Sequence, residues 1–184
     1  MDVFISHSSR DKKYADAVCN HLENAKIRCW VAPRDIVPGI QYADAIISAI
    51  DDCEIFLIIW TDNANRSTHV SKEVERAVSK GKIIIPIRMD ACNPTKTMEY
   101  YLSSEHWLDA MTPPFEKHLS RLVQAVSQLL DARVSENAVR RTAPDLSVER
   151  TAAQTPEPIT EIHPDNWTAS GSMLSRIRRL FQDS

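Results

Sequence analysis

Short apolar runs alternate with helical stripes along the first 132 residues of the chain. Five runs have the length and composition of β-strands, at residues 3–5, 27–31, 55–60, 83–87 and 106–108. Between and after them, apolar residues recur at i, i+3, i+4 and i+7, which is the spacing of one helix face. These stripes predict helices over residues 14–22, 42–50, 67–80 and 115–130.

The third apolar run, residues 55–60, shows no alternation of apolar and polar positions. Such a strand needs cover on both faces, as in a parallel sheet. The alternation of strands and helices therefore predicts an α/β fold, a doubly wound, flavodoxin-like sheet of five parallel strands in the order 2-1-3-4-5, with helices on both faces. In that order, ligands bind between the first and third strands, at their carboxyl ends. The loops at residues 6–11, 32–41 and 60–67 lie at this edge, and the start of the third helix adjoins them.

Residues 133–184 have a different composition. Four prolines (Pro144, Pro156, Pro158 and Pro164) lie there among Thr, Ser, Ala, Glu and Arg. The segment has too little apolar surface to offset its ordering entropy. We therefore predict a folded domain over residues 1–132 and a disordered linker or tail over 133–184. Residues 172–181 could form a short basic amphipathic helix that touches a membrane surface or a partner, although a solvated chain end is the preferred interpretation.

The composition excludes several classes of function. The chain has only 3 glycines, where average usage would give roughly a dozen, and no glycine-rich phosphate-binding motif is present. The formal charge of -3 gives no basic excess that would predict a nucleic-acid partner. No apolar window is long enough to span a bilayer, and the first residues lack the features of a signal peptide.

The cysteines also favour an intracellular protein. All 4 lie far apart, without a C-x-x-C pair or a histidine at metal spacing. We interpret them as reduced, mostly buried thiols, and we predict a cytoplasmic protein without a metal site or a bound cofactor.

Glu73 is the carboxylate with the greatest potential for chemistry. It lies three residues after Val70 and four before Ala77, at the margin of an apolar helix stripe that begins near the predicted crevice. A carboxylate there could stabilise a positive charge or handle a proton. From spacing alone, however, an ion pair with Arg76 on the helix surface is the preferred interpretation.

Four further residues could contact a nucleotide at the same edge. Trp30 and Trp60 end the second and third strands, where each could stack on a flat ring, although core packing is the more common use. Arg34 and Asp35 lie in a loop flanked by prolines. They could bind phosphate and ribose, or they could pair with each other or with another subunit.

The polar segment after the first strand resembles a nucleophile site only superficially. Ser6, Ser8 and Ser9 surround His7, but no nucleophile elbow is present and no carboxylate can be assigned to orient the histidine. We interpret the three serines as turn and helix-cap residues.

Several of these segments together resemble the TIR (Toll/interleukin-1 receptor) domain family. Residues 2–6 (DVFIS) resemble its first box, residues 34–39 (RDIVPG) its second box or BB loop, and residues 106–107 (HW) its third. Residues 67–73 followed by 82–87 (KIIIPI) are similar to the helix that carries the glutamate of NAD-cleaving members. The resemblance covers roughly residues 1–131, with all boxes in order. The chain resembles prokaryotic or intracellular effector TIR proteins more than the tails of receptors.

The resemblance implies that the substrate is NAD+ and that Glu73 is the catalytic residue. Cleavage of the bond between nicotinamide and ribose builds positive charge on the sugar, and a carboxylate beneath the sugar would stabilise it. Nicotinamide leaves as a neutral base, so a single carboxylate suffices. The products would be nicotinamide and ADP-ribose or a cyclic isomer.

The same match and the loops at the crevice give the predicted substrate-binding residues. Ser8 and Ser9 lie in the loop that lines the pocket of the family, and Trp30 matches an aromatic position near the nucleotide. His69 takes the position four residues before the glutamate, where many enzymatic members carry tryptophan. The full set is Ser8, Ser9, Trp30, Arg34, Asp35, Trp60 and His69.

TIR domains also self-associate, which implies a second kind of surface. The predicted interface residues lie in the BB loop: Arg34, Asp35, Ile36, Pro38 and Gly39. A head-to-tail contact through this loop would build open filaments rather than closed dimers. The resemblance thus implies homo-oligomerisation that activates NAD+ cleavage, in defence or cell-death signalling.

The alternative is a non-enzymatic adaptor that binds other TIR domains through the BB loop, with Glu73 incidental. The helix over residues 67–73 favours the enzyme, whereas the absent tryptophan at residue 69 favours the adaptor. A phosphoacceptor receiver domain of the same strand order is excluded, because the third strand ends without an aspartate at its tip.

Overall fold

The computed structural model describes the backbone of residues 1–142 and the side chains of residues 1–135. One sheet of five parallel strands has the order β2-β1-β3-β4-β5. The strands are β1 (Val3–Ser6), β2 (Cys29–Val31), β3 (Ile55–Trp60), β4 (Ile83–Arg88) and β5 (Leu108–Asp109). This confirms the predicted doubly wound α/β fold.

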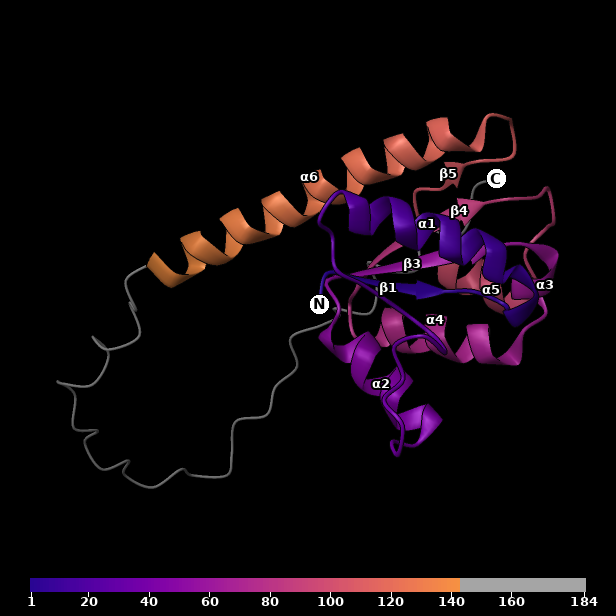
Figure 1. The fold of residues 1–184 in the computed structure, drawn as a ribbon, viewed down its shortest axis with the longest axis horizontal. Helices are drawn as coiled ribbons and strands as arrows, with labels where there is room; N and C mark the ends of the chain where they lie inside the picture. Colours follow the sequence, from indigo (N-terminus) through magenta and orange to yellow (C-terminus); the bar gives the residue numbers. More distant parts are fainter. Residues whose placement is uncertain (143–184) are drawn as a thin grey trace, which may run out of the picture. The chain divides into compact units, whose positions relative to one another are not determined.

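Helices cover both faces of the sheet (Figure 1). They are α1 (Lys12–Asn24), α2 (Tyr42–Asp52), α3 (Asp62–Asn65), α4 (Thr68–Ser79), α5 (Lys96–Leu102) and α6 (Phe115–Thr142), and a short 3-10 turn, η1 (Ser9–Asp11), precedes α1. One apolar core lies between the sheet and helices α1 and α6, and a second lies between the sheet and helices α2, α4 and α5.

Strand β3 lies at the centre because both of its faces are apolar. All six of its residues are buried, as the unbroken apolar run predicts. Leu57 and Ile59 pack in the first core, whereas Phe56, Ile58 and Trp60 pack in the second. Burial of a large apolar side chain contributes about 1.5–3 kcal/mol, so this strand supplies much of the stability of the sheet.

The structure differs from the sequence prediction in several short elements. The fifth strand lies at Leu108–Asp109 rather than at residues 106–108. Helix α3 lies in a segment expected to be a loop, and the seven-residue helix α5 was not predicted. Each helix begins after an N-cap threonine, Thr61 for α3 and Thr95 for α5. The side chain of each threonine accepts a hydrogen bond from a backbone N–H in the first turn, which stabilises the start of the helix.

Helix α6 continues to Thr142, ten residues past the predicted domain boundary at residue 132. Arg133 in this extension forms an ion pair of 2.9 Å with Glu54 at the beginning of β3. The apolar stripe of α6 ends near residue 130, which is why hydrophobic spacing could not indicate the remaining turns. The predicted amphipathic helix at 172–181 lies outside the described residues. Within residues 1–142, no helix is both long and apolar enough to cross a membrane.

Candidate active site

A pocket of about 530 Å³ opens at the carboxyl edge of the sheet, beside the end of β1. Its walls come from β1 and the loop after it, from the loop after β2, and from the starts of α2 and α4. The lining residues are Phe4, Ile5, His7, Ser8, Ser9, Lys12, Ala32, Pro33, Tyr42, Ser67, His69 and Glu73. The volume is in the usual range for a small-molecule site.

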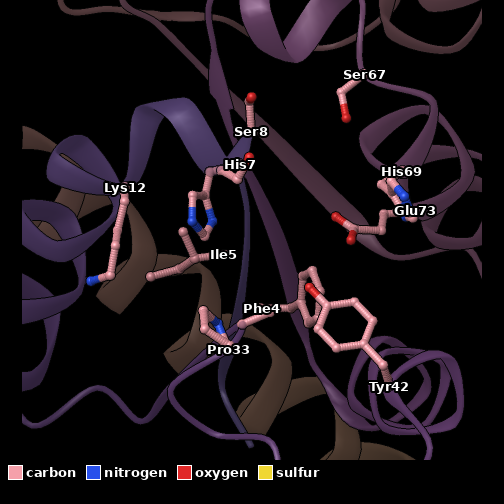
Figure 2. A pocket seen from close by; sticks show the side chains of 12 residues that line it. Phe4, Ile5, His7, Ser8, Lys12, Pro33, Tyr42, Ser67, His69 and Glu73 are labelled. Atoms are coloured by element: carbon pink, nitrogen blue, oxygen red, sulfur yellow. The ribbon is translucent and has the colours of Figure 1, made fainter.

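Glu73 lies in the second turn of α4, and its carboxylate points into this pocket (Figure 2). The helix is anchored by its apolar stripe, where Val70, Val74 and Ala77 are fully buried against the sheet. Ser67 caps the helix, since its hydroxyl accepts a hydrogen bond of 3.3 Å from the N–H of Val70. Glu73 is half-buried at the margin of the stripe, as its spacing predicts.

Ser6 fixes one oxygen of this carboxylate. The hydroxyl of Ser6, the last residue of β1, donates a hydrogen bond of 2.6 Å to Oε2 of Glu73. Ser6 is only 1% exposed and pairs with Ile58 of β3 in the sheet, so its position is set by the core. The hydrogen bond leaves Oε1 of Glu73 free to face a ligand.

The surroundings of Glu73 also change its acidity. Burial raises the pKa of Glu73 to about 7, and the hydrogen bond from Ser6 acts in the opposite direction. Arg76 does not neutralise Glu73, because its guanidinium pairs with Asp51 of α2 at 2.6 Å. The surface ion pair that spacing alone favours for Glu73 is therefore not formed, and the carboxyl group can change its charge near neutral pH.

Two other side chains whose pKa is shifted face the same pocket (Figure 2). His7 lies on the wall opposite Glu73, and burial lowers the pKa of its imidazole. Tyr42, at the start of α2, directs its hydroxyl toward Glu73. Burial raises the pKa of Tyr42, and the negative charge of Glu73 raises it further. Both shifts favour the uncharged form of the side chain, of the His7 imidazole and of the Tyr42 phenol.

A buried polar cluster holds the loops around the pocket together. Asp11 in η1 is 4% exposed and accepts hydrogen bonds of 2.6 Å from Thr61 and 3.0 Å from Asn63. These contacts join the loop after β1 to the loop after β3. Ser8 caps η1, since its hydroxyl accepts a hydrogen bond of 3.4 Å from the N–H of Arg10, which agrees with the turn-and-cap interpretation of this serine.

Three of the predicted substrate-binding residues line the pocket with Glu73. Ser8 and Ser9 contribute from the loop after β1, and His69 from the first turn of α4. His69 also lines a smaller, mostly apolar cavity of about 240 Å³ between α2 and α4, on the other side of Tyr42 and Glu73. Its imidazole therefore lies at the junction of two hollows.

The two tryptophans occupy other places. Trp60 is fully buried, and its indole N–H lies 3.5 Å from the carbonyl of Cys92 while its ring packs edge-on against Trp107. The prediction that Trp60 contacts substrate is contradicted, because its ring has no surface open to a ligand. Trp30 stacks on Phe4 with the ring centroids 5.0 Å apart, and it lines a different hollow of about 550 Å³ at the β2 edge.

Arg34 and Asp35 are engaged with the protein itself. Arg34 forms ion pairs of 2.8 Å with both Glu23 of α1 and Asp35. Asp35 also accepts a hydrogen bond of 2.8 Å from the N–H of Val31 and lines the same hollow as Trp30. Neither residue lines the Glu73 pocket. Of the two roles that the sequence allows for Arg34 and Asp35, the structure shows the pairing with each other and not a contact with the pocket.

The remaining predicted interface residues lie in a protruding loop. Ile36 is half-buried, whereas Pro38 and Gly39 are exposed, and Gly39 has a φ of +93° that a side chain would rarely adopt. The same loop exposes the apolar side chains of Val37 and Ile40 by 58% and 51%. Exposed apolar residues in a loop are typical of surfaces that bind another protein.

Several residues at the site were not assigned to it from the sequence, among them Ser6, which holds Glu73, and Tyr42, which lines the pocket. Ser6 was interpreted as a turn residue, and Tyr42 as part of a buried stripe, although Tyr42 is 52% exposed. His7 and Lys12 line the pocket as well. The sequence places Ser6 and His7 in the loop at the carboxyl edge of the sheet, but it gives no signal that selects these two residues from that loop. Within residues 1–135, no three His, Cys, Asp or Glu side chains gather as metal ligands would.

Comparison with known structures places the fold among TIR domains. The TIR domain of the Toll-related receptor TRR-2 from Hydra magnipapillata is 25% identical, with a TM-score of 0.56, over 67% of this chain and 98% of that one. The TIR domains of the Roq1 resistosome are 11% identical, with a TM-score of 0.58, over 68% of this chain and 98% of that one.

A metazoan TIR-STING receptor from C. gigas is 18% identical, with a TM-score of 0.52. Here the match covers 68% of this chain and 40% of the receptor chain. No curated protein matches the chain in sequence. The family profile of the TIR domain matches residues 3–123, which include all five strands and the helix that carries Glu73. The chain therefore belongs to the TIR domain family, as its sequence boxes predict.

Proposed function

We propose that this TIR domain cleaves NAD+ at the bond between nicotinamide and ribose, with Glu73 as the catalytic residue. The observation that carries the proposal is the carboxylate of Glu73, held by Ser6 and directed into a pocket of about 530 Å³. The pocket is in the size range of small-ligand sites, and it combines apolar walls with convergent polar groups. A lone carboxylate in such a place suits a reaction that develops positive charge.

In the proposed reaction, the bond from ribose C1′ to the nicotinamide nitrogen breaks, and its electron pair leaves with nicotinamide. The sugar acquires oxocarbenium character, which the ionised Glu73 stabilises. Water then attacks C1′ and loses a proton to give ADP-ribose, or a nitrogen of the adenine ring attacks to give a cyclic isomer. Oε1 of Glu73, which Ser6 leaves free, is the oxygen placed to accept a hydrogen bond from a ribose hydroxyl.

Ser8, Ser9 and His69 are the substrate-binding residues that this pocket supports best. Lys12 on the pocket wall carries the positive charge that a pyrophosphate requires, and its ion pair with Asp16 is solvent-exposed and weak. Arg34 and Asp35 are assigned to the loop rather than to substrate, because their partners lie within the protein. In this proposal NAD+ is the substrate, and its cleavage by water requires no bound cofactor.

We further propose that self-association through the loop at residues 33–41 activates the enzyme, in a cytoplasmic defence or cell-death pathway. The exposed Val37 and Ile40 support this part of the proposal. The Roq1 TIR domains, which share the fold, were solved in a resistosome that recognises a pathogen effector. A contact of this loop with a different face of the next copy would give open assemblies.

The experiment measures nicotinamide released from NAD+ over a range of protein concentrations. We expect release that rises more than proportionally with concentration, and that Glu73→Ala abolishes. Glu75→Ala is the matched control, since Glu75 lies on the exposed side of the same helix. If concentrated wild-type protein releases no nicotinamide, the enzymatic proposal is wrong.

The alternative function is an adaptor that binds other TIR domains without catalysis, favoured by the same exposed loop. Gly39→Pro tests the loop, because proline cannot adopt the φ of +93° found there. Light scattering should show weaker association for this variant than for wild type. Tyr100→Ser is the control, because Tyr100 is 80% exposed on α5 and lies outside the loop. Unchanged association of Gly39→Pro would remove the loop from the interface.

A further inference from the structure

Two of the four cysteines lie together on one face of the sheet, outside the proposed active site. Cys19 in α1 is 1% exposed, and Cys29 in β2 is half-buried against the same core. The two side chains pack in the same core, and their thiol groups are close enough to affect each other's pKa. They are 10 positions apart in sequence and belong to different elements, so the fold rather than a motif brings them together.

The guanidinium of Arg34 contacts both cysteines. Its Nη1 lies 3.1 Å from Sγ of Cys19, and its Nη2 donates a hydrogen bond of 3.3 Å to the carbonyl of Cys29. The other charged groups around it are Glu23 and Asp35, each at 2.8 Å from Nη2. A permanent cation therefore lies against one sulfur of the pair.

The contacts make the two thiols chemically unequal. The interaction with the Cys29 thiol lowers the pKa of Cys19, and the charge of Arg34 lowers it further, whereas burial and the carboxylate of Glu23 raise it. The same interaction and burial raise the pKa of Cys29. The proton of Cys29 can also be donated to the carbonyl of Ile27, at 3.6 Å from its Sγ. The guanidinium that lies 3.1 Å from Sγ of Cys19 favours the thiolate form of that cysteine, as in a reactive thiol beside a resolving thiol.

We propose that Cys19 and Cys29 are a redox modification site, which a peroxide converts into an intramolecular disulfide. The thiolate of Cys19 attacks one peroxide oxygen, the O–O bond breaks, and the departing hydroxide takes up a proton to become water. Cys19 is then a sulfenic acid. The sulfur of Cys29 attacks the sulfur of Cys19, the S–O bond breaks, and the hydroxyl group leaves as water with the proton of Cys29. Two thiols are oxidised and one hydrogen peroxide is reduced to two waters.

Oxidation of the two cysteines would change the contacts of Arg34, which belongs to the loop at residues 33–41. The guanidinium loses the anionic sulfur and keeps its ion pairs with Glu23 and Asp35. Asp35 in turn holds the end of β2 through the N–H of Val31. The oxidation state of the pair is thus linked to the anchoring of the loop at residues 33–41, independently of any reaction with NAD+.

The other two cysteines serve as internal controls. Burial raises the pKa of Cys53, whose Sγ donates a hydrogen bond of 3.2 Å to the carbonyl of Ile50. Burial and the carboxylate of Asp90 raise the pKa of Cys92 to about 12. Cys92 is half-buried, so it is no less accessible than Cys19, but it remains protonated at neutral pH.

The test is peptide mapping of the reduced full-length chain after treatment with hydrogen peroxide at pH 7. Trypsin cleaves after Lys26 and Arg28, which separates the two cysteines unless a disulfide joins them. We expect a linked peptide pair containing Cys19 and Cys29, which dithiothreitol separates, to form at least about tenfold faster than oxidation of Cys92. In Cys29→Ser, a dione reagent should trap a sulfenic acid at Cys19.

Arg34→Gln tests whether the charge of the arginine acts on Cys19. The measurement is the pH dependence of Cys19 alkylation, which a purely structural role of Arg34 would leave unchanged. Removing the cation should shift the pH dependence of Cys19 alkylation to higher pH, whereas alkylation of Cys92 keeps its pH dependence. The proposal is overturned if Cys92 or Cys53 is oxidised first, if the disulfide joins other cysteines or two chains, or if Cys19 alkylation in Arg34→Gln follows the wild-type profile.

Discussion

The hydroxyl of Ser6 lies 2.6 Å from Oε2 of Glu73 and joins the end of β1 to the second turn of α4. The sheet fixes the donor and the apolar stripe of α4 fixes the acceptor, so the carboxylate is held before any substrate arrives. Preorganised charge of this kind needs little rearrangement when positive charge develops on a bound sugar. The pair therefore links the geometry of the fold to the proposed chemistry.

Ser6→Ala should shift the activity toward higher pH. The hydrogen bond from Ser6 lowers the pKa of Glu73, which burial raises to about 7. Without it, a smaller fraction of Glu73 is ionised at pH 7, and nicotinamide release there should fall roughly three- to tenfold, with recovery at higher pH. The measurement is the pH profile of kcat/KM, with Ser79→Ala at the end of α4 as the control. An equal loss at every pH would mean that Ser6 acts only on the fold.

Glu73→Gln should stabilise the protein in mildly alkaline solution. The pKa of Glu73 is about 7 in the folded chain, above the usual 4.5. The folded state therefore binds more protons than the unfolded state between these values, and stability falls as the pH rises through this window. At pH 8 the variant should melt about 2–6 °C above wild type, with the difference shrinking toward pH 5.

Thermal unfolding at both pH values measures this effect, with Glu75→Gln as the matched variant, because Glu75 is exposed on the same helix. A gain in Tm that does not change between pH 5 and pH 8 would show that the charge of Glu73 is not what costs stability.

Trp60→Phe should weaken folding without affecting substrate. The indole is fully buried, contacts the carbonyl of Cys92, and packs against Trp107. The smaller ring should lower the free energy of unfolding by about 1–3 kcal/mol, while KM for NAD+ stays within twofold of wild type. Urea unfolding and steady-state kinetics test this together.

His69→Ala should have the opposite effects to Trp60→Phe on KM and on stability, because His69 is exposed and lines the pocket. It should raise KM and leave stability within about 0.5 kcal/mol. A larger change in KM for Trp60→Phe than for His69→Ala would contradict the position of both residues.

The sheet order could be predicted because it depends on local patterns. The unbroken apolar run at residues 55–60 indicates a central strand, and the stripe of α4 places Glu73 at its margin. The contacts of single side chains could not be predicted in this way. The partner of Ser6 lies 67 positions away in sequence, and it depends on how α4 packs on the sheet.

The tryptophans and the loop arginine show the same limit. Trp60 ends β3 and Trp30 lies in the middle of β2, but which face each ring presents depends on the strand register and on neighbouring rings. Arg34 forms an ion pair with Glu23 on α1, and no spacing rule in the sequence connects α1 to the loop after β2. The end of α6 was missed because its last turns lack the apolar stripe on which the prediction rests.

The central claim is that the ionised carboxylate of Glu73 acts on bound NAD+. The most direct measurement compares NAD+ binding and nicotinamide release by assembled Glu73→Gln and Glu75→Gln. We predict that Glu73→Gln binds NAD+ within about threefold of wild type but turns it over about 10³-fold more slowly, whereas Glu75→Gln retains both properties. Turnover by Glu73→Gln within a few-fold of wild type would contradict the account.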